Sequence, residues 1–465
     1  MWLNINGVNR MFMCDPLTES LADVLRRLGC TSVKVGCGIG VCGSCTVLLN
    51  GELVRSCTRK IGRIEEYSKV ITVEGIGTPN HLHPIQVAFM NNGAIQCGFC
   101  TPGFVVSTYG LLIKNNNPTR QEVRDWFTQH KNVCRCTGYK QIVNAVMDAA
   151  RVMRGECTVD DIKVKMPEDG EYYGKPLVRP TSLAKVCGLA DYGDDQELKM
   201  PANAFHVAMV QPKLAHHAKI LKIDISEAQK MPGVAKIILA KDLLDAGGSN
   251  IMAEANFHER STVRVPARKV LADDIIYRYG DVVALAVADT KQHARAAAAK
   301  VKVDIEKLPA YMNFLEAAMP DAQRIHEDTP NIYCMQPVLK GEGLKEPRKV
   351  AEIIEKSAYS VEGSFYSSRE PHLSIEGDAV QAYFDEDGFL TFQCKSQGVY
   401  SSITRIGKCL GVPTSKMRVI MNPTGASFGW STHAGDLALA GAACVVMNAP
   451  VALSMSYEEH QHFSG

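Results

Sequence analysis

The start of the chain alternates between hydrophobic and polar positions in a way that predicts two β-hairpins. Strand-like segments 2–5 (WLNI) and 8–13 (VNRMFM) are joined by an Asn-Gly pair at 6–7, and segment 46–54 (TVLLNGELV) carries another pair at 50–51. Asn-Gly is a strong hairpin signal because both residues accept the left-handed backbone of a two-residue turn. We therefore expect a small sheet.

Between the hairpins, segment 17–29 (LTESLADVLRRLG) has the residue spacing of an amphipathic helix. Its apolar side consists of Leu17, Leu21, Val24, Leu25 and Leu28. The first part of the chain is therefore predicted to be a sheet packed on one helix.

Three further helices are predicted from the next apolar patterns. Segment 102–115 begins with proline and follows Thr101, which suits an N-cap. Segment 119–130 opens with a Thr-x-x-Glu capping box, and segment 139–153 continues with helical spacing. Together these patterns predict a compact helical domain.

The C-terminal half mixes strand and helix patterns. Segment 280–310 predicts a strand, a helix and a strand in succession, and 437–453 is the longest apolar run. Asn448 and Pro450 interrupt that run, so its unbroken part is shorter than the ~18 residues of a membrane span, and a buried helix is predicted. The last segment, 449–463, is predicted to be a strand, which should not be left with an open hydrophobic edge.

Composition narrows the class of protein. At roughly 150 residues a domain, the 465 residues suggest about three domains, and 46% hydrophobic residues are ordinary for a globular protein. A net charge of +1 without basic runs gives no reason to expect nucleic acid or a membrane as partner. The first residues lack the features of a signal peptide, so we expect a cytoplasmic protein.

Cysteine is the unusual component. There are sixteen cysteines, and eight of them crowd into four close groups before residue 137. In a chain without an export signal, such groups favour metal sites over disulfides. The other eight, such as Cys14, Cys187 and Cys409, are scattered, and we expect them to be small buried side chains.

The first cysteine set has the spacing of a plant-type ferredoxin. It consists of Cys37, Cys42, Cys45 and Cys57. The pattern C-x4-C-x2-C with a distant fourth cysteine is typical of a [2Fe–2S] cluster. Interleaved glycines permit the backbone turns of a loop that points its amides at the cluster, which favours iron–sulfur over zinc. They are Gly36, Gly38, Gly40 and Gly43.

The second cysteine set surrounds the predicted helices. It consists of Cys97, Cys100, Cys134 and Cys136. Each pair precedes a helix start, where partial positive charge favours thiolates and an anionic cluster. The one-residue spacing of Cys134 and Cys136 differs from the usual zinc spacing of two to four residues. From spacing alone, however, zinc remains an alternative for this set.

The two sets in this order resemble the molybdenum hydroxylase (xanthine oxidase) family, and in particular its flavin-free bacterial aldehyde oxidoreductases. The motifs are GCGIGVCGSC…SC followed by QCGFCTPG…CRCTGY. In that family both sets bind [2Fe–2S] clusters, so the resemblance displaces the zinc alternative. Residues 179–195 resemble the start of the molybdenum domain and follow the second set too closely for a flavin domain to lie between them.

The resemblance implies an α+β multidomain fold. It consists of a ferredoxin-like β-grasp [2Fe–2S] domain, a four-helix [2Fe–2S] domain and the N-terminal part of an α/β molybdenum-binding domain. The expected boundaries are 1–76 and 77–156 for the two cluster domains, 157–193 for a connecting segment, 194–310 for the first part of the molybdenum domain and 311–465 for the incomplete start of the molybdopterin-binding region.

Six residues match family positions that contact the molybdenum cofactor. They are Gln96, Cys136, Gln397, Gly425, Phe428 and Gly429. The first two match positions that touch the pterin. Gln397 matches a glutamine that, in some members, is hydrogen-bonded to a molybdenum oxo group. The last three belong to a glycine-rich segment, in which Ala426 and Ser427 depart from the family toward larger residues.

We expect no catalytic residue in these 465 residues, because the resemblance places the general-base glutamate in a later part of the family's sequence. His372 and Glu376 match another family motif, which we interpret as structural support. Purine-hydroxylating members carry a glutamate four residues after the phenylalanine of the glycine-rich segment. Thr432 occupies that position here, which argues against xanthine as substrate.

The implied activity is the oxidation of an aldehyde with water to a carboxylic acid. Electrons would leave through the two clusters to an external acceptor, which could be flavodoxin, ferredoxin or a flavin subunit. The implied cofactors are two [2Fe–2S] clusters and molybdenum on molybdopterin in its cytosine dinucleotide form, shared with a second polypeptide in a dimer of heterodimers. The alternatives are a subunit of a hydroxylase for N-heterocycles and an electron-transfer subunit without molybdopterin.

Overall fold

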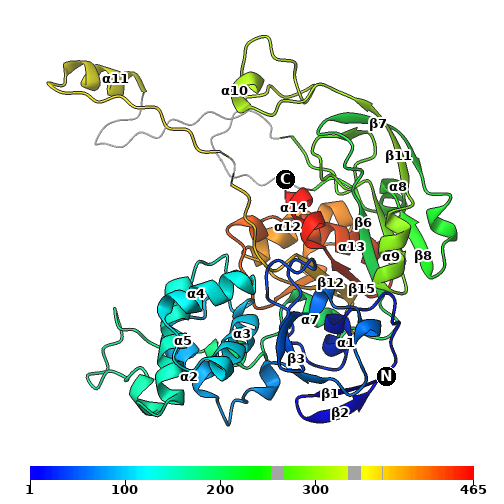
Figure 1. Ribbon diagram of the computed structural model, residues 1–465. Coiled ribbons are helices and arrows are strands. Elements are labelled where there is room, and N and C mark those ends of the chain that lie inside the picture. The colour runs from blue at the N-terminus through cyan, green and yellow to red at the C-terminus, as the bar shows by residue number, and fades with distance from the viewer. Residues whose placement is uncertain (253–265, 333–346, 369, 465) are drawn as a thin grey trace.

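The computed structural model describes residues 1–252, 266–332, 347–368 and 370–464. In Figure 1 the N-terminal sheet and a group of four helices lie side by side beneath the C-terminal region. The two N-terminal parts are joined directly, since the Val133 N–H donates to the Cys42 carbonyl at 3.0 Å. Both cysteine sets therefore lie in adjoining parts of the fold.

The N-terminal part is a five-stranded sheet in the order β2-β1-β5-β3-β4. Its strands are β1 (Trp2–Ile5), β2 (Val8–Met11), β3 (Thr46–Leu49), β4 (Glu52–Arg55) and β5 (Lys69–Ile71). The two predicted hairpins are confirmed, and Asn6 and Asn50 have φ angles of 53° and 50° in their turns. Left-handed backbone at these positions is what the two-residue turn requires.

Helix α1 (Leu21–Arg27) packs on this sheet but is shorter than predicted. Leu21 and Leu25 are fully buried, whereas Leu17 is 82% exposed and lies before the helix. The helix begins after Ser20, whose side chain accepts from the Asp23 N–H in a capping box. The helix therefore begins at its capping residue. Leu17 does not belong to the helix, although its apolar spacing suggested that it would.

The helical part consists of four helices. They are α2 (Pro84–Asn91), α3 (Thr101–Lys114), α4 (Arg120–Gln129) and α5 (Tyr139–Met153). The capping box of α4 is formed as predicted, by Thr119 and Glu122. At α3 the N-cap is Cys100 rather than Thr101, so the second cysteine set touches the helix start directly.

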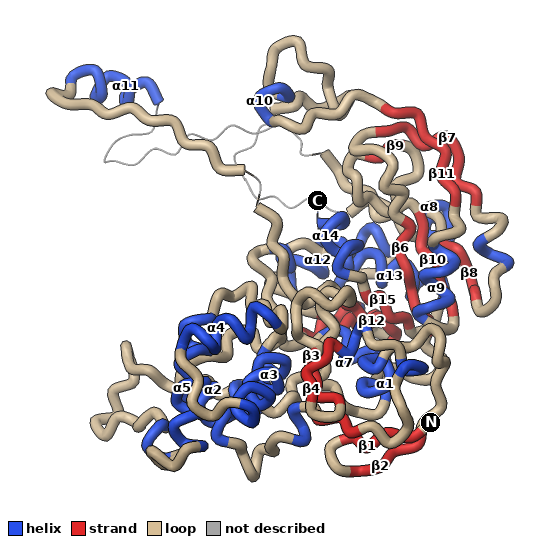
Figure 2. The backbone as a smooth tube through the Cα atoms, in the orientation of Figure 1, coloured by secondary structure: helices blue, strands red, loops and turns tan. Residues whose placement is uncertain are grey.

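Two short helices, α6 (Ser182–Val186) and α7 (Gly193–Glu197), lead into the C-terminal region. This region is built on a seven-stranded sheet in the order β14-β13-β12-β15-β6-β10-β8. Figure 2 shows the strands in red. They are β6 (Phe205–Val210), β8 (Val234–Ile238), β10 (Ala284–Ala288), β12 (Ala379–Phe384), β13 (Leu390–Cys394), β14 (Met417–Met421) and β15 (Val451–Ser454).

A smaller sheet in the order β11-β7-β9 flanks the large one. Its strands are β7 (Ala218–Asp224), β9 (Ile275–Ile276) and β11 (Lys302–Lys307). The remaining helices are α8 (Ala240–Asp245), α9 (Lys291–Ala298), α10 (Phe314–Ala317), α11 (Pro347–Lys356), α12 (Val399–Leu410), α13 (Gly435–Met447) and α14 (Tyr457–Ser464). The predicted strand, helix and strand of 280–310 are β10, α9 and β11, but the two strands belong to different sheets.

The predictions for the last fifty residues are partly confirmed. The long apolar run contains the buried helix α13, which ends where Asn448 takes a left-handed φ of 47°. No helix in the described ranges is long and apolar enough to cross a membrane. The prediction of one strand over 449–463 is wrong, because β15 is short and α14 follows it. β15 also has no open edge, since it pairs with β12 on one side and β6 on the other.

Candidate functional site

The first cysteine set lies in the loop between α1 and β3 and in the turn after β4. The thiols lie in pairs: Cys42 hydrogen-bonds to Cys37 and lowers the pKa of Cys37 to about 5, and Cys57 lowers the pKa of Cys45 to about 7. The Val41 N–H donates to the Cys37 sulfur at 3.3 Å. The same hydrogen bonds raise the pKa of Cys42 and of Cys57, so each pair favours one thiolate and one thiol. An inward amide and paired thiols suit an iron–sulfur cluster.

The glycines of this loop have two different roles. Gly38, Gly40 and Gly43 have φ angles of 69°, 76° and 69°, which supports the prediction that the loop needs glycine to turn. Gly36 is different, because a methyl group there would lie 2.6 Å from Cγ2 of Ile375. Gly36 therefore lets the first cysteine loop approach the C-terminal region closely.

The second cysteine set gathers at the start of α3 and just before α5. The Cys97 and Cys134 thiols both hydrogen-bond to Cys136 and lower the pKa of Cys136 to about 3. Cys134 also hydrogen-bonds to Cys100, which connects the two pairs. Hydrogen bonds thus connect the four thiols in one row beside the two helix starts.

The thiols of both sets are arranged in pairs. A [2Fe–2S] cluster is held by two cysteines on each of two irons. The paired thiols therefore fit a [2Fe–2S] cluster in each set.

The second cysteine set faces the predicted cofactor segment. A small cavity is lined by Cys97, Cys100, Cys134 and Cys136 and by Ile375, Gly425 and Ala426. Residues far apart in the sequence thus surround one space. The glycine-rich segment borders the second set directly.

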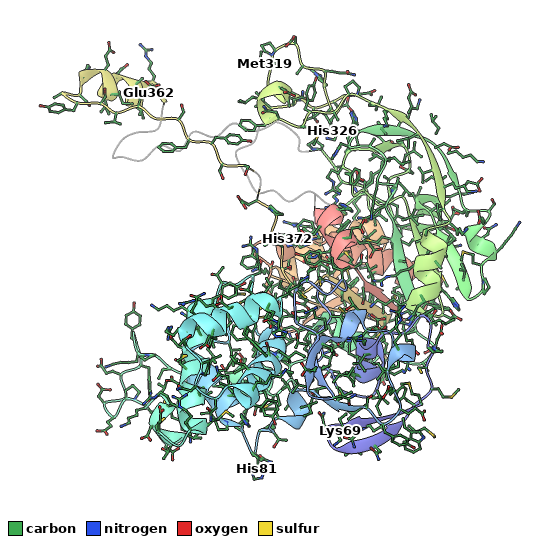
Figure 3. All side chains as sticks on the ribbon, in the orientation of Figure 1. Lys69, His81, Met319, His326, Glu362 and His372 are labelled. Atoms are coloured by element: carbon green, nitrogen blue, oxygen red, sulfur yellow. The ribbon has the colours of Figure 1, made fainter. Side chains whose placement is uncertain are left out.

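Arg135, between two of the cysteines, strengthens this junction. Its guanidinium carbon lies 5.0 Å from the centre of the Phe428 ring, and its Nε donates to the His372 carbonyl at 3.0 Å. His372 is labelled in Figure 3, where it lies between the helical part and the C-terminal region. The sequence interpretation missed Arg135, and its place between two candidate ligands was the signal that could have revealed it.

The predicted cofactor contacts fall into two groups. The Gln96 side chain donates to the Cys136 carbonyl at 3.1 Å, so these two residues lie together. Gln397 accepts from the Ser427 hydroxyl at 2.8 Å and so lies beside the glycine-rich segment. In that segment Phe428 is 51% exposed, with φ of 53°, and Gly429 follows at 90°. The exposed residues Phe428 and Gly429, with their left-handed backbone, can approach a bound cofactor.

Glu376 is buried beneath the same segment. One carboxylate oxygen accepts from the Gly193 N–H at 3.0 Å, and the other accepts from the Gly425 N–H at 2.5 Å. Burial raises the pKa of Glu376 to about 7. These contacts agree with the interpretation that Glu376 has a structural role.

His372 also packs within the protein, stacked on the Trp430 ring with centroids 5.6 Å apart. Trp430 donates to the buried Asp378 at 2.8 Å. Burial opposes the charge of Asp378, but His460 and Lys395 hold its pKa well below the usual range. The sequence interpretation missed this buried ionic group. Through Asp378 it holds Trp430, at the end of residues 425–430, in place.

Comparisons with known proteins agree along the whole chain. Residues 3–68 match the 2Fe-2S iron-sulfur cluster binding domain, and residues 72–147 match the [2Fe-2S] binding domain. Residues 187–309 match the aldehyde oxidase and xanthine dehydrogenase a/b hammerhead domain. Residues 325–465 match the molybdopterin cofactor-binding domain.

Individual relatives give the same picture. The chain is 44% identical over 464 residues to an aldehyde oxidoreductase of Megalodesulfovibrio gigas, covering 100% of this chain and 50% of that protein. The solved aldehyde oxidoreductase of Desulfovibrio desulfuricans superposes with a TM-score of 0.90 at 44% identity, covering 99% of this chain and 50% of that one. The small FeS subunit of nicotinate dehydrogenase from Eubacterium barkeri is 43% identical over 31% of this chain and 90% of its own length. The chain thus spans about half the length of the aldehyde oxidoreductases that it matches.

Proposed function

Because the chain belongs to the molybdenum hydroxylase family, we propose that it is the iron–sulfur-bearing portion of a molybdenum-dependent aldehyde oxidoreductase. The reaction converts an aldehyde and water into a carboxylic acid, two protons and two electrons. The observation that carries the proposal is the similarity to an aldehyde oxidoreductase along the entire chain, through the cluster domains and the molybdopterin-binding region alike.

The residues of this chain would hold the cofactors and exclude water from them. The two cysteine sets would bind one [2Fe–2S] cluster each, and Gln96 and Cys136 would contact the pterin. Gln397, Gly425, Phe428 and Gly429 would hold the cofactor from the C-terminal region. When bound, the molybdenum centre supplies the two-electron oxidation, and the clusters pass electrons on.

The rest of the enzyme is part of the proposal. We propose that the catalytic base and further cofactor contacts come from polypeptide equivalent to the other half of the longer relatives, carried by a second subunit in a dimer of heterodimers. The cofactor would be the cytosine dinucleotide form, and a flavodoxin, a ferredoxin or a flavin subunit would accept the electrons.

N-heterocycles are the second candidate substrates. The similarity to the small FeS subunit of nicotinate dehydrogenase favours this reading, but it covers only the cluster domains. Thr432 supplies no carboxylate at the position where purine-hydroxylating members carry one. Its hydroxyl donates instead to the Gly429 carbonyl at 2.7 Å.

The test begins with intact mass spectrometry of the natively purified protein and with molybdenum and iron measured on the same sample. The proposal expects further polypeptide, one molybdenum and four irons per copy. An anaerobic panel of aldehydes and N-heterocycles, with a dye as electron acceptor, then separates the two substrate classes. Four irons without molybdenum would instead identify an electron-transfer subunit.

A further inference from the structure

Two side chains from the segment that leads into the C-terminal region donate hydrogen bonds to the backbone of the second cysteine set. Lys185 of α6 donates from Nζ to the Gln96 carbonyl at 3.0 Å. Tyr192, just before α7, donates from its hydroxyl to the Cys97 carbonyl at 2.8 Å. Two consecutive peptide groups next to a cluster ligand are thus held from one side.

Gly98 shows how closely this segment lies over the cysteine loop. A methyl group at Gly98 would lie 2.5 Å from Cδ of Lys185 and 2.7 Å from the hydroxyl of Tyr192. Gly98 also has a φ of 90°, which favours glycine. The stem of Lys185 is therefore packed against the loop, and its ammonium group has little freedom to leave it.

The ammonium group of Lys185 lies one peptide bond from Cys97, because it donates to the Gln96 carbonyl. In the part of the chain that the structure describes, no carboxylate forms an ion pair with it. Burial lowers the pKa of Lys185, whereas Cys97 and Cys136 raise it and Arg179 lowers it. Near the first set the situation is different. The buried Lys34 is paired with Asp195 at 2.6 Å, and Arg26 is paired with the same carboxylate at 2.7 Å.

We propose that Lys185 is a positioning residue for the second [2Fe–2S] cluster, which holds the Gln96–Gly98 backbone in place and favours the reduced state of the cluster. The inference rests on the proposed function only in requiring that the second cysteine set binds a cluster. Reduction adds one electron to the cluster and so one negative charge, which a nearby fixed cation stabilises. Lys185 itself exchanges no electron.

The experiment is an anaerobic redox titration of the iron-loaded protein, with the EPR signals of the two clusters followed separately. Lys185→Met removes the charge but keeps the stem, and Lys185→Arg keeps the charge. Lys175→Met is the matched control, because Lys175 is an exposed lysine of the same segment. Iron content is measured on every sample.

The expected result is a shift of the second-cluster potential to more negative values in Lys185→Met. The first cluster should stay at its wild-type potential, and Lys185→Arg and Lys175→Met should behave as wild type. An unchanged second-cluster potential in iron-loaded Lys185→Met overturns the proposal. If this variant loses iron, the potential is read from Lys185→Gln, and iron loss in both variants also overturns the electrostatic role. Fewer than four irons in the wild-type protein would contradict the proposed function itself.

Discussion

The Glu376 carboxylate accepts a hydrogen bond of 2.5 Å from the backbone N–H of Gly425, the first residue of the glycine-rich segment predicted to contact the cofactor. A methyl group at Gly425 would lie 2.6 Å from the same carboxylate oxygen. The other oxygen holds the Gly193 N–H at the start of α7. One buried side chain thus connects the glycine-rich segment to the start of α7. Tyr192, just before α7, hydrogen-bonds to the backbone of the second cysteine set.

The substitution Glu376→Gln tests this link. Glutamine can accept from one of the two N–H groups but presents its own amide hydrogens to the other, which leaves a buried donor unsatisfied. At pH 5, where the Glu376 carboxyl is protonated in the folded protein, we expect a loss of about 1–3 kcal/mol in the free energy of unfolding. We also expect less bound molybdenum and an unchanged iron content. Thermal unfolding and metal analysis measure both. The exposed Glu386→Gln is the control, and equal behaviour of the two variants would contradict the link.

The buried carboxyl also predicts a pH dependence. Burial raises the pKa of Glu376 from 4.5 to about 7, so the folded protein holds this proton more tightly than the unfolded chain. The resulting stabilisation is complete below pH 4.5 and is lost as the pH rises through about 7. A shift of this size corresponds to about 3 kcal/mol.

Because the glutamine side chain of Glu376→Gln does not titrate, the comparison with wild type isolates the contribution of the Glu376 proton to stability. The wild-type advantage in free energy of unfolding should fall by about 3 kcal/mol between pH 4.5 and pH 8. Denaturant titrations of both proteins across this range measure it. An advantage that stays constant with pH would show that the carboxyl does not titrate there.

Gly36→Ala tests the contact between the first cysteine loop and the C-terminal region. The added methyl group would lie 2.6 Å from Cγ2 and 2.8 Å from the carbonyl of Ile375. We expect a destabilisation of about 1–3 kcal/mol from overpacking, visible in thermal unfolding. Adding Ile375→Ala should restore part of the loss. The control is Gly363→Ala, where the nearest atom is 3.4 Å from the new methyl group.

Arg135→Met tests the junction between the second cysteine set and the glycine-rich segment. The variant loses the hydrogen bond to the His372 carbonyl and the contact with the Phe428 ring. We expect hydrogen exchange at residues 426–430 to become roughly 30-fold faster, because a cation–π contact and a hydrogen bond are each worth about 1 kcal/mol. The exposed Arg124→Met is the control. Unchanged exchange in Arg135→Met would mean that the junction does not depend on this side chain.

Local chemistry made part of the fold predictable from sequence. The Asn-Gly turns, the capping box at Thr119 and the helix stop at Asn448 depend on neighbouring residues, and the structure confirms them. The partners of β15 lie far away in the chain, so the sequence could indicate that its edges would be covered but not by which strands.

The residues of the candidate site divide in the same way, into those set by the local sequence and those set by distant contacts. Both cysteine sets could be located from local spacing, although the spacing of the second set left zinc as an alternative until the family resemblance was considered. The contacts of Glu376 with Gly425 and of Arg135 with Phe428 could not be found, since they form only when separate domains pack together. Lys185 lies in a segment whose own sequence shows no sign of a nearby cluster.

The most direct test of the central claim is the visible spectrum of the natively purified, metal-loaded protein before and after anaerobic addition of an aldehyde. We expect the aldehyde to bleach the iron–sulfur absorption, because electrons from its oxidation reduce the clusters that the two cysteine sets hold. Full reduction by dithionite with no bleaching by any aldehyde, in a sample that contains molybdenum and four irons per copy, would contradict it.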